Sequence, residues 1–176
     1  MNYADIKYCD VANGEGVRVS LFVSGCTHHC KECFNKEAWD FHYGEPFTQK
    51  EIDRILEYLK PNYIAGLSLL GGEPMEPVNQ EGILPLLRAV KQTYPEKNIW
   101  CYTGYLFDKD VLDKMCKESE VTKEIVSYLD IVVDGEFMID RKNLKINFRG
   151  SDNQRIIDVK KTLDAGEIVH WEREIH

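Results

Sequence analysis

Apolar residues along the chain alternate between short continuous runs and repeats with helical spacing. The run VRVSLFV (17–23) is rich in β-branched residues and therefore predicts a strand. Three later runs of the same kind predict further strands, namely IAGLSLL (64–70), NIWCYT (98–103) and DIVVDGEF (130–137). Helical periodicity fills the stretches between them.

These intervening stretches predict amphipathic helices. Thr48 and Glu51 have the spacing of a capping box and predict the start of the first helix, which Pro61 ends. A third helix is predicted to begin at Asp108, which can cap it. The apolar repeats lie at residues 52–59, 83–90 and 111–115, and a short helix is expected at 122–129.

Strands that alternate with helices indicate βαβ units and an α/β fold with a mostly parallel sheet. A complete eight-fold barrel takes about 250 residues, and this chain has 176. We therefore expect a partial, open (βα) barrel of about five to six strands. One domain should span residues 1–176, and the tail GEIVHWEREIH (166–176) could add a strand or pack on the surface.

An unusual loop follows each predicted strand: SGC, GGEP, TGY and VDGEF. In parallel α/β sheets and barrels, functional groups gather at the carboxyl ends of the strands. The four loops therefore predict one site at one rim of the sheet.

Composition limits the classes of function. The net charge of −8 argues against broad binding to nucleic acid, which needs a basic face. The N-terminus lacks a secretory h-region, and no apolar run approaches the ~20 residues of a membrane span. We expect a soluble cytoplasmic protein whose thiols stay reduced, without nucleic-acid or membrane partners.

Three of the six cysteines lie in the loop that follows the first predicted strand. They are Cys26, Cys30 and Cys33, and together they span eight residues. Soft thiolates select zinc, copper(I) or iron–sulfur clusters. His28 or His29 could complete a tetrahedral zinc site. A 4Fe–4S cluster held by three cysteines would instead leave one iron open to a substrate.

The cysteine spacing, joined to GGEP after the second predicted strand, resembles the radical S-adenosylmethionine (SAM) enzymes. Within them, NGEGVRVSLFVSGCTHHCKECFN, LLGGEP, IWCYTGY and FRGSDNQRI resemble the activating proteins of anaerobic ribonucleoside-triphosphate reductase. The resemblance covers roughly residues 2–158, and residues 159–176 look like a C-terminal extension. It implies one 4Fe–4S cluster on Cys26, Cys30 and Cys33, with SAM on the open iron.

The resemblance also implies which residues contact SAM. Phe34 would lie against the adenine. The methionine amino group would bind at Gly72, where either a backbone carbonyl or the carboxylate of Glu73 would accept its hydrogen bond. The full set of implied contacts is Glu32, Cys33, Phe34, Gly71, Gly72 and Glu73.

The implied reaction is reductive cleavage of SAM to a 5′-deoxyadenosyl radical, which leaves a glycyl radical on the reductase. Reduced flavodoxin or ferredoxin is the implied electron donor, and no catalytic side chain is expected beyond the cluster and SAM. A pyruvate formate-lyase activase, a 7-carboxy-7-deazaguanine synthase and a zinc-binding interaction module without activity remain alternatives.

Other polar residues carry weaker expectations. His28 and His29 are expected to be a solvated pair, with hydrogen bonds to cluster sulfurs as the alternative. Asp134 and Gly135 are expected to form a turn, with a position facing the ligand as the alternative. The late segment that contains Arg149, Asn153, Gln154 and Arg155 is expected at the surface, where our hypothesis is that it docks the reductase.

Overall fold

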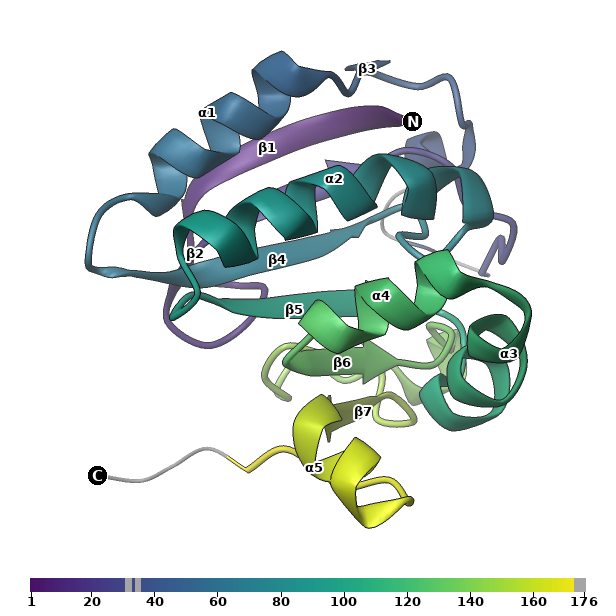
Figure 1. Cartoon of the computed structure of the whole chain (residues 1–176). Coiled ribbons are helices and arrows are strands. Elements are labelled where there is room, and N and C mark those ends of the chain that lie inside the picture. Colours follow the sequence, from purple (N-terminus) through teal and green to yellow (C-terminus); the bar gives the residue numbers. More distant parts are fainter. Residues whose placement is uncertain (31–32, 34–35, 173–176) are drawn as a thin grey trace.

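Seven strands form one open sheet in the computed structural model, which describes residues 1–30, 33 and 36–172 (Figure 1). Strands β2, β4, β5 and β6 are parallel, and antiparallel strands flank them on both sides. In sheet order the strands are β3 (Glu45–Pro46), β1 (Asn2–Asp10), β2 (Val17–Val23), β4 (Ile64–Gly71), β5 (Asn98–Thr103), β6 (Ile131–Asp134) and β7 (Arg155–Asp158).

This arrangement confirms the predicted α/β class and the open, partial barrel with a parallel centre. The four predicted strands are β2, β4, β5 and β6. The sheet exceeds the expected five to six strands because β1, β3 and β7 were not anticipated. Strand β1 escaped prediction because Tyr3 is its one buried residue, so it lacks an apolar period.

Helices α1, α2 and α4 cover one face of the sheet (Figure 1). Adjacent strand residues point to opposite faces, so Leu21 and Leu69 pack beneath these helices, whereas Phe22 and Leu70 line a cavity on the other face. The helices are α1 (Gln49–Leu59), α2 (Pro77–Thr93), the π-helix η2 (Phe107–Met115), α3 (Cys116–Glu118), α4 (Glu120–Tyr128) and α5 (Val159–Ala165), with 3₁₀ turns η1 (Lys36–Trp39) and η3 (Ile139–Arg141).

One of the two predicted helix starts is confirmed. The Thr48 N–H donates to Glu51 Oε2 at 2.7 Å, as a capping box requires. The prediction for Asp108 is wrong, because η2 begins after Leu106 and has π rather than α geometry. Asp108 lies inside that helix, where its Oδ1 accepts a hydrogen bond from Arg155 at 3.0 Å.

Trp171 of the C-terminal extension packs on the face of the sheet that the helices leave open, whereas Val159 and Ile168 join the main core. The Trp171 ring lies 5.2 Å from the Trp100 ring and 6.3 Å from the Phe148 ring, centroid to centroid. A single bridge between Ile157 and His170 joins this segment to β7. The tail was expected either to add a strand or to pack on the surface. It forms one isolated bridge in place of a full strand, and Trp171 packs on the sheet.

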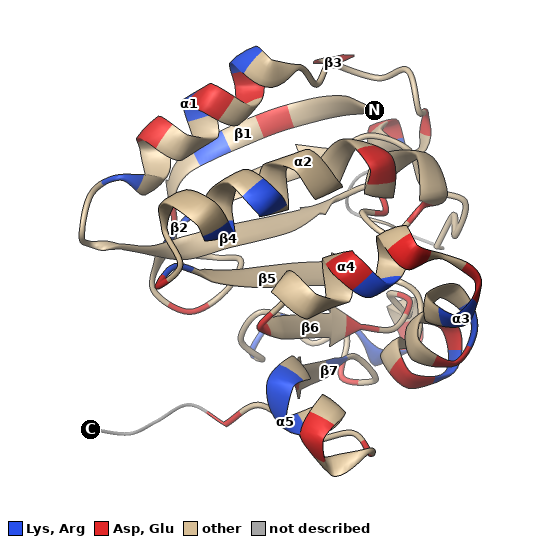
Figure 2. Ribbon diagram, in the orientation of Figure 1, with Lys and Arg blue, Asp and Glu red and all other residues tan. Residues whose placement is uncertain are grey.

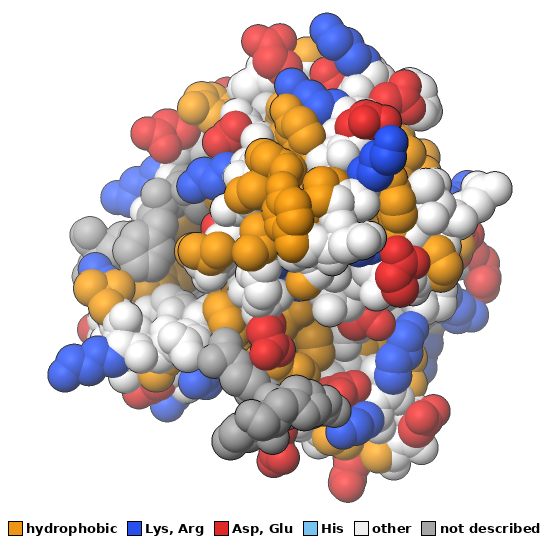
Figure 3. All heavy atoms as spheres, turned by 90° about the vertical axis from the view of Figure 1, so that its left-hand side faces the viewer, with side chains coloured by type: hydrophobic (Ala, Val, Ile, Leu, Met, Phe, Trp, Pro, Cys, Tyr) orange, Lys and Arg blue, Asp and Glu red, His pale blue; other side chains and the backbone are white. Residues whose placement is uncertain are grey.

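Charged residues lie on the outer faces of helices and in loops, and β4 and β5 carry none (Figure 2). At the N-terminal ends of the parallel strands, hydrophobic side chains gather among the charged ones (Figure 3). Tyr8, Val11 and Tyr63 are exposed there. Among the described residues, no helix is long and apolar enough to cross a membrane.

A buried arginine ties the first loop to the centre of the sheet. Arg18 is fully buried and donates to Ser68 Oγ at 2.7 Å, Leu67 O at 2.9 Å and Glu15 O at 2.9 Å. Burial lowers the pKa of Arg18 to about 10, so the guanidinium stays charged at neutral pH. A Cβ on Gly14 would lie 2.7 Å from Arg18 Cδ, so this loop packs directly on the guanidinium stem.

We expect Arg18→Met to lower the free energy of unfolding by about 3 kcal/mol, because it leaves several buried acceptors without donors. Urea unfolding of the metal-free chain measures this loss. Lys50→Met serves as the control, since Lys50 is exposed and should change stability by less than about 0.5 kcal/mol. Equal losses in the two variants would contradict the role given to Arg18.

Candidate active site

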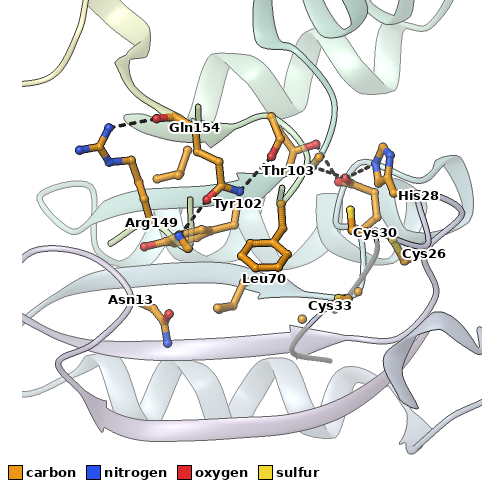
Figure 4. Close-up of a pocket in the computed structure, with 18 of the residues that line it drawn as sticks. Asn13, Cys26, His28, Cys30, Cys33, Leu70, Tyr102, Thr103, Arg149 and Gln154 are labelled. Atoms are coloured by element: carbon orange, nitrogen blue, oxygen red, sulfur yellow. Dashed lines mark hydrogen bonds and ion pairs between the residues drawn. The ribbon is translucent and has the colours of Figure 1, made fainter. Parts of the chain in front are cut away.

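A cavity of about 580 Å³ opens at the carboxyl ends of the parallel strands (Figure 4). All four loops predicted from the sequence contribute to its wall, through Cys26, Gly72, Thr103 and Gly135. The expectation of one site at one rim is therefore confirmed. The size is that of a pocket for a small ligand or cofactor.

The three clustered cysteines all line this cavity. Cys26 is buried, Cys30 and Cys33 are half-buried, and none forms a disulfide. Burial raises the pKa of the Cys26 thiol to about 11. The pKa of the Cys30 thiol is also raised, mainly by burial and secondly by the negative charge of Glu136. A positively charged metal centre is therefore needed to hold these groups as thiolates.

The donor set suits a cluster better than a single ion. Within residues 1–30, 33 and 36–172, no three Cys, His, Asp or Glu side chains lie close enough to hold one metal ion. In an iron–sulfur cluster each thiolate binds a different iron, so the sulfurs stand further apart than around one zinc. Three thiols that line one cavity without converging on a single ion position are compatible with that arrangement.

The GGEP loop packs against the backbone of the cysteine loop, residues 24–30. The Gly72 N–H donates to Val23 O and the Glu73 N–H to Gly25 O, both at 2.8 Å. A Cβ on Gly72 would lie 2.6 Å from Gly25 O and 2.8 Å from Ala38 O. Glycine at position 72 is thus required by the contact between the two loops.

The side chain of Glu73 is buried beneath the cavity and its hydrogen-bonding capacity is filled. Its Oε1 accepts from Gly104 N at 2.7 Å and His28 Nε2 at 2.8 Å. Its Oε2 accepts from Thr103 Oγ1 and Met75 N, each at 2.8 Å. A carboxylate offers about four lone-pair sites, so none is left for a ligand ammonium. Of the two acceptors considered from the sequence, the geometry favours a backbone carbonyl.

His28 links the cysteine loop to two other loops, which corrects the expectation of a solvated pair. Its Nδ1 donates to Glu136 Oε1 at 3.0 Å while Nε2 donates to Glu73, and its ring meets Tyr105 edge-on at 4.4 Å. Burial alone would lower the pKa of His28, but hydrogen bonds and charge from Glu73 and Glu136 raise it to about 9. His29, by contrast, is exposed and stacks on Trp39.

The expected turn at Asp134 and the expected surface position of Arg155 both need correction. Asp134 is fully buried at the end of β6, and its carboxylate accepts from Arg155 Nε at 3.0 Å and from Phe107 N at 2.7 Å. Arg155 also reaches Asp108, so it joins β6, β7 and η2. A buried carboxylate needs such a cation, but the burial of Asp134 is visible only in the structure, so the sequence did not point to this pair.

The other polar residues near β7 are also bonded internally. Gln154 Nε2 donates to Gly135 O at 2.9 Å, and Arg149 Nη1 donates to Gln154 O at 3.0 Å. Asn153 Nδ2 donates to Glu136 O at 2.9 Å. These residues hold the cavity wall in place. The side chains of Gln154 and Arg155 are engaged within the fold, so they are poorly placed to dock the reductase.

Sequence reasoning missed much of the cavity wall. The irregular segment 137–150 supplies Phe137, Leu144, Ile146 and Phe148, and the strands supply Tyr102. No periodic signal marks such a segment. The expected SAM contacts Glu32 and Phe34 lie outside the described residues, whereas Cys33, Gly71, Gly72 and Glu73 all line the cavity.

Comparison with known proteins matches residues 12–157 to a family model described as a 4Fe-4S single cluster domain. Curated relatives include anaerobic ribonucleoside-triphosphate reductase-activating proteins. That of Enterobacteria phage T4 is 43% identical over 89% of this chain and 93% of its own length. Those of Pasteurella multocida and Escherichia coli K12 are 40% and 38% identical, over 89% and 88% of this chain and 96% of their own lengths.

We expect His28→Asn to lower the free energy of unfolding by about 1–3 kcal/mol, because asparagine is too short to bridge both carboxylates and leaves buried Glu73 short of a donor. Chemical unfolding of the metal-free variants measures the change. His29→Asn is the matched control, one residue further along the same loop, and should stay within about 0.5 kcal/mol of the parent. A smaller loss for His28→Asn than for the control would refute the bridging role.

Proposed function

The chain belongs to the family of anaerobic ribonucleoside-triphosphate reductase-activating proteins, and on this basis we propose that it installs a glycyl radical on such a reductase. It is a radical SAM enzyme. The family match confirms the predicted 4Fe–4S cluster and sets aside the zinc-binding module. The relatives named above favour the reductase activase over the formate-lyase activase and the deazaguanine synthase.

The residues present fit the cluster and SAM. We assign Cys26, Cys30 and Cys33 as cluster ligands, because three free thiols line one cavity. Backbone at Gly71 and Gly72 would receive the methionine end of SAM, and Glu73 would hold that backbone in place. Glu32 and Phe34 complete the proposed SAM contacts.

When bound, the cluster held by Cys26, Cys30 and Cys33 would supply the one-electron reduction that cleaves SAM, and the cleaved SAM would supply the radical that takes a hydrogen atom from a glycine Cα. The chain's own residues shape the space in which this occurs. Four apolar side chains contribute to its wall and would keep water from a bound ligand, namely Phe22, Leu70, Val133 and Phe137. No described side chain is required as a general acid or base.

Finer features of the function are part of the same proposal. Reduced flavodoxin or ferredoxin would supply the electron, and the protein would work in the cytoplasm. A single radical SAM domain would span residues 1–176. The contacts of Trp171 with Trp100 and Phe148 support inclusion of the extension from about residue 159 in that domain.

The convergence of the cysteine triad with the GGEP backbone in one cavity is the observation that carries this proposal. The test combines the anaerobically reconstituted protein with SAM, dithionite and an anaerobic ribonucleoside-triphosphate reductase. We expect a glycyl-radical doublet in the EPR spectrum and one 5′-deoxyadenosine per radical formed. 5′-Deoxyadenosine without a doublet would reject the reductase as partner, and neither product from cluster-loaded protein would reject the SAM chemistry.

We expect Gly72→Ala to weaken SAM binding at least tenfold, because its Cβ would push the GGEP backbone away from Gly25 O. Equilibrium dialysis with radiolabelled SAM measures affinity, and iron and sulfide assays report cluster content. Gly82→Ala is the control, since Gly82 lies outside the cavity wall and its Cβ would contact only the N-terminal residue, Met1. Unchanged affinity in Gly72→Ala would contradict the assignment of this backbone to SAM.

A further inference from the structure

We propose that the segment 141–149, here called the basic strip, docks the reductase loop that carries the target glycine, and that this loop presents acidic and apolar side chains beside the glycine. The inference rests on the proposed function. It also replaces the earlier docking hypothesis for residues 149–155, whose Gln154 and Arg155 side chains are engaged within the fold.

The basic strip is anchored at both of its ends. Its base is closed by a bridge between Lys142 and Ser151, and by a hydrogen bond from Asn143 N to Gly150 O at 3.2 Å. Arg141 O accepts from Asp152 N at 2.9 Å. The strip therefore has a defined position over the cavity.

One side of the strip faces the cavity. Ile146, Phe148 and Arg149 contribute to the cavity wall, as does Leu144. The Phe148 ring packs 5.3 Å from the Trp100 ring, centroid to centroid, which fixes the strip on the open face of the sheet. A loop that settles on the strip would thus lie directly beside the SAM position.

The strip also exposes one apolar residue where it borders the cavity. Leu144 lines the cavity and is nevertheless 77% exposed, more than the other large hydrophobic residues of the described chain. Single exposed leucines are ordinary. This one is continuous with a pocket that must admit a protein substrate, so an incoming apolar side chain would cover it.

The positive charge of the basic strip indicates that the partner loop also carries acidic side chains. RKNLKINFR holds four cations and no acid, in a chain whose net charge is −8. Arg141 is paired with Asp152, whereas Lys145 is exposed and directly follows Leu144 in the chain. A local positive patch on an acidic protein attracts an acidic segment and orients it before contact.

The first test uses Lys145→Glu, with Lys161→Glu on α5 as the matched charge reversal away from the mouth. We expect Lys145→Glu to retain 5′-deoxyadenosine formation without reductase, with SAM and dithionite, within twofold of the parent. Its Kd for the reductase should rise about tenfold at low ionic strength, and less at 0.5 M salt. Lys161→Glu should bind like the parent.

The second test uses Leu144→Ser and reads only reductase affinity, with Leu163→Ser on α5 as the control. We expect at least a fivefold weaker complex for Leu144→Ser and no change for Leu163→Ser. Parent-like affinity in both strip variants would overturn the proposal while the glycyl-radical activity of the parent stands. A parent that forms no glycyl radical on the reductase would overturn the function and this inference together.

Discussion

The buried carboxylate of Glu73 is the constraint on which the rest of the site depends. Its four hydrogen bonds come from the cysteine loop, from its own loop and from the end of β5. A buried charge without such partners costs several kcal/mol, so these segments cannot separate independently. The geometry of the cavity is therefore a condition of folding, and the site is organised before any ligand arrives.

One face of the sheet packs the hydrophobic core, and the other face lines the cavity. The helix-covered face is packed with aliphatic residues, while the open face carries Arg18, Tyr102 and the cavity wall. This division explains why a chain shorter than a full barrel can hold a reactive centre. The helices stabilise the parallel strands, and the strand ends position groups that do not themselves react.

Interactions local in the chain could be predicted from the sequence, and those between distant segments could not. The parallel strands, the capping box at Thr48 and the cysteine spacing each depend on neighbours within a few residues. The position of His28 depends on carboxylates 45 and 108 residues away, and no pattern in the sequence encodes that distance. Strand β1 and the wall segment 137–150 were missed because neither has an apolar period.

The sequence separation between His28 and its partners bears on how the protein is made. Synthesis delivers the cysteines early, whereas Glu73 follows His28 by 45 residues and Glu136 follows it by 108. A nascent chain that ends before Glu136 has all three thiols but lacks one of the carboxylates that orient their loop. The loop that carries the thiols therefore gains its full set of hydrogen bonds only after β6 and Glu136 have been synthesised.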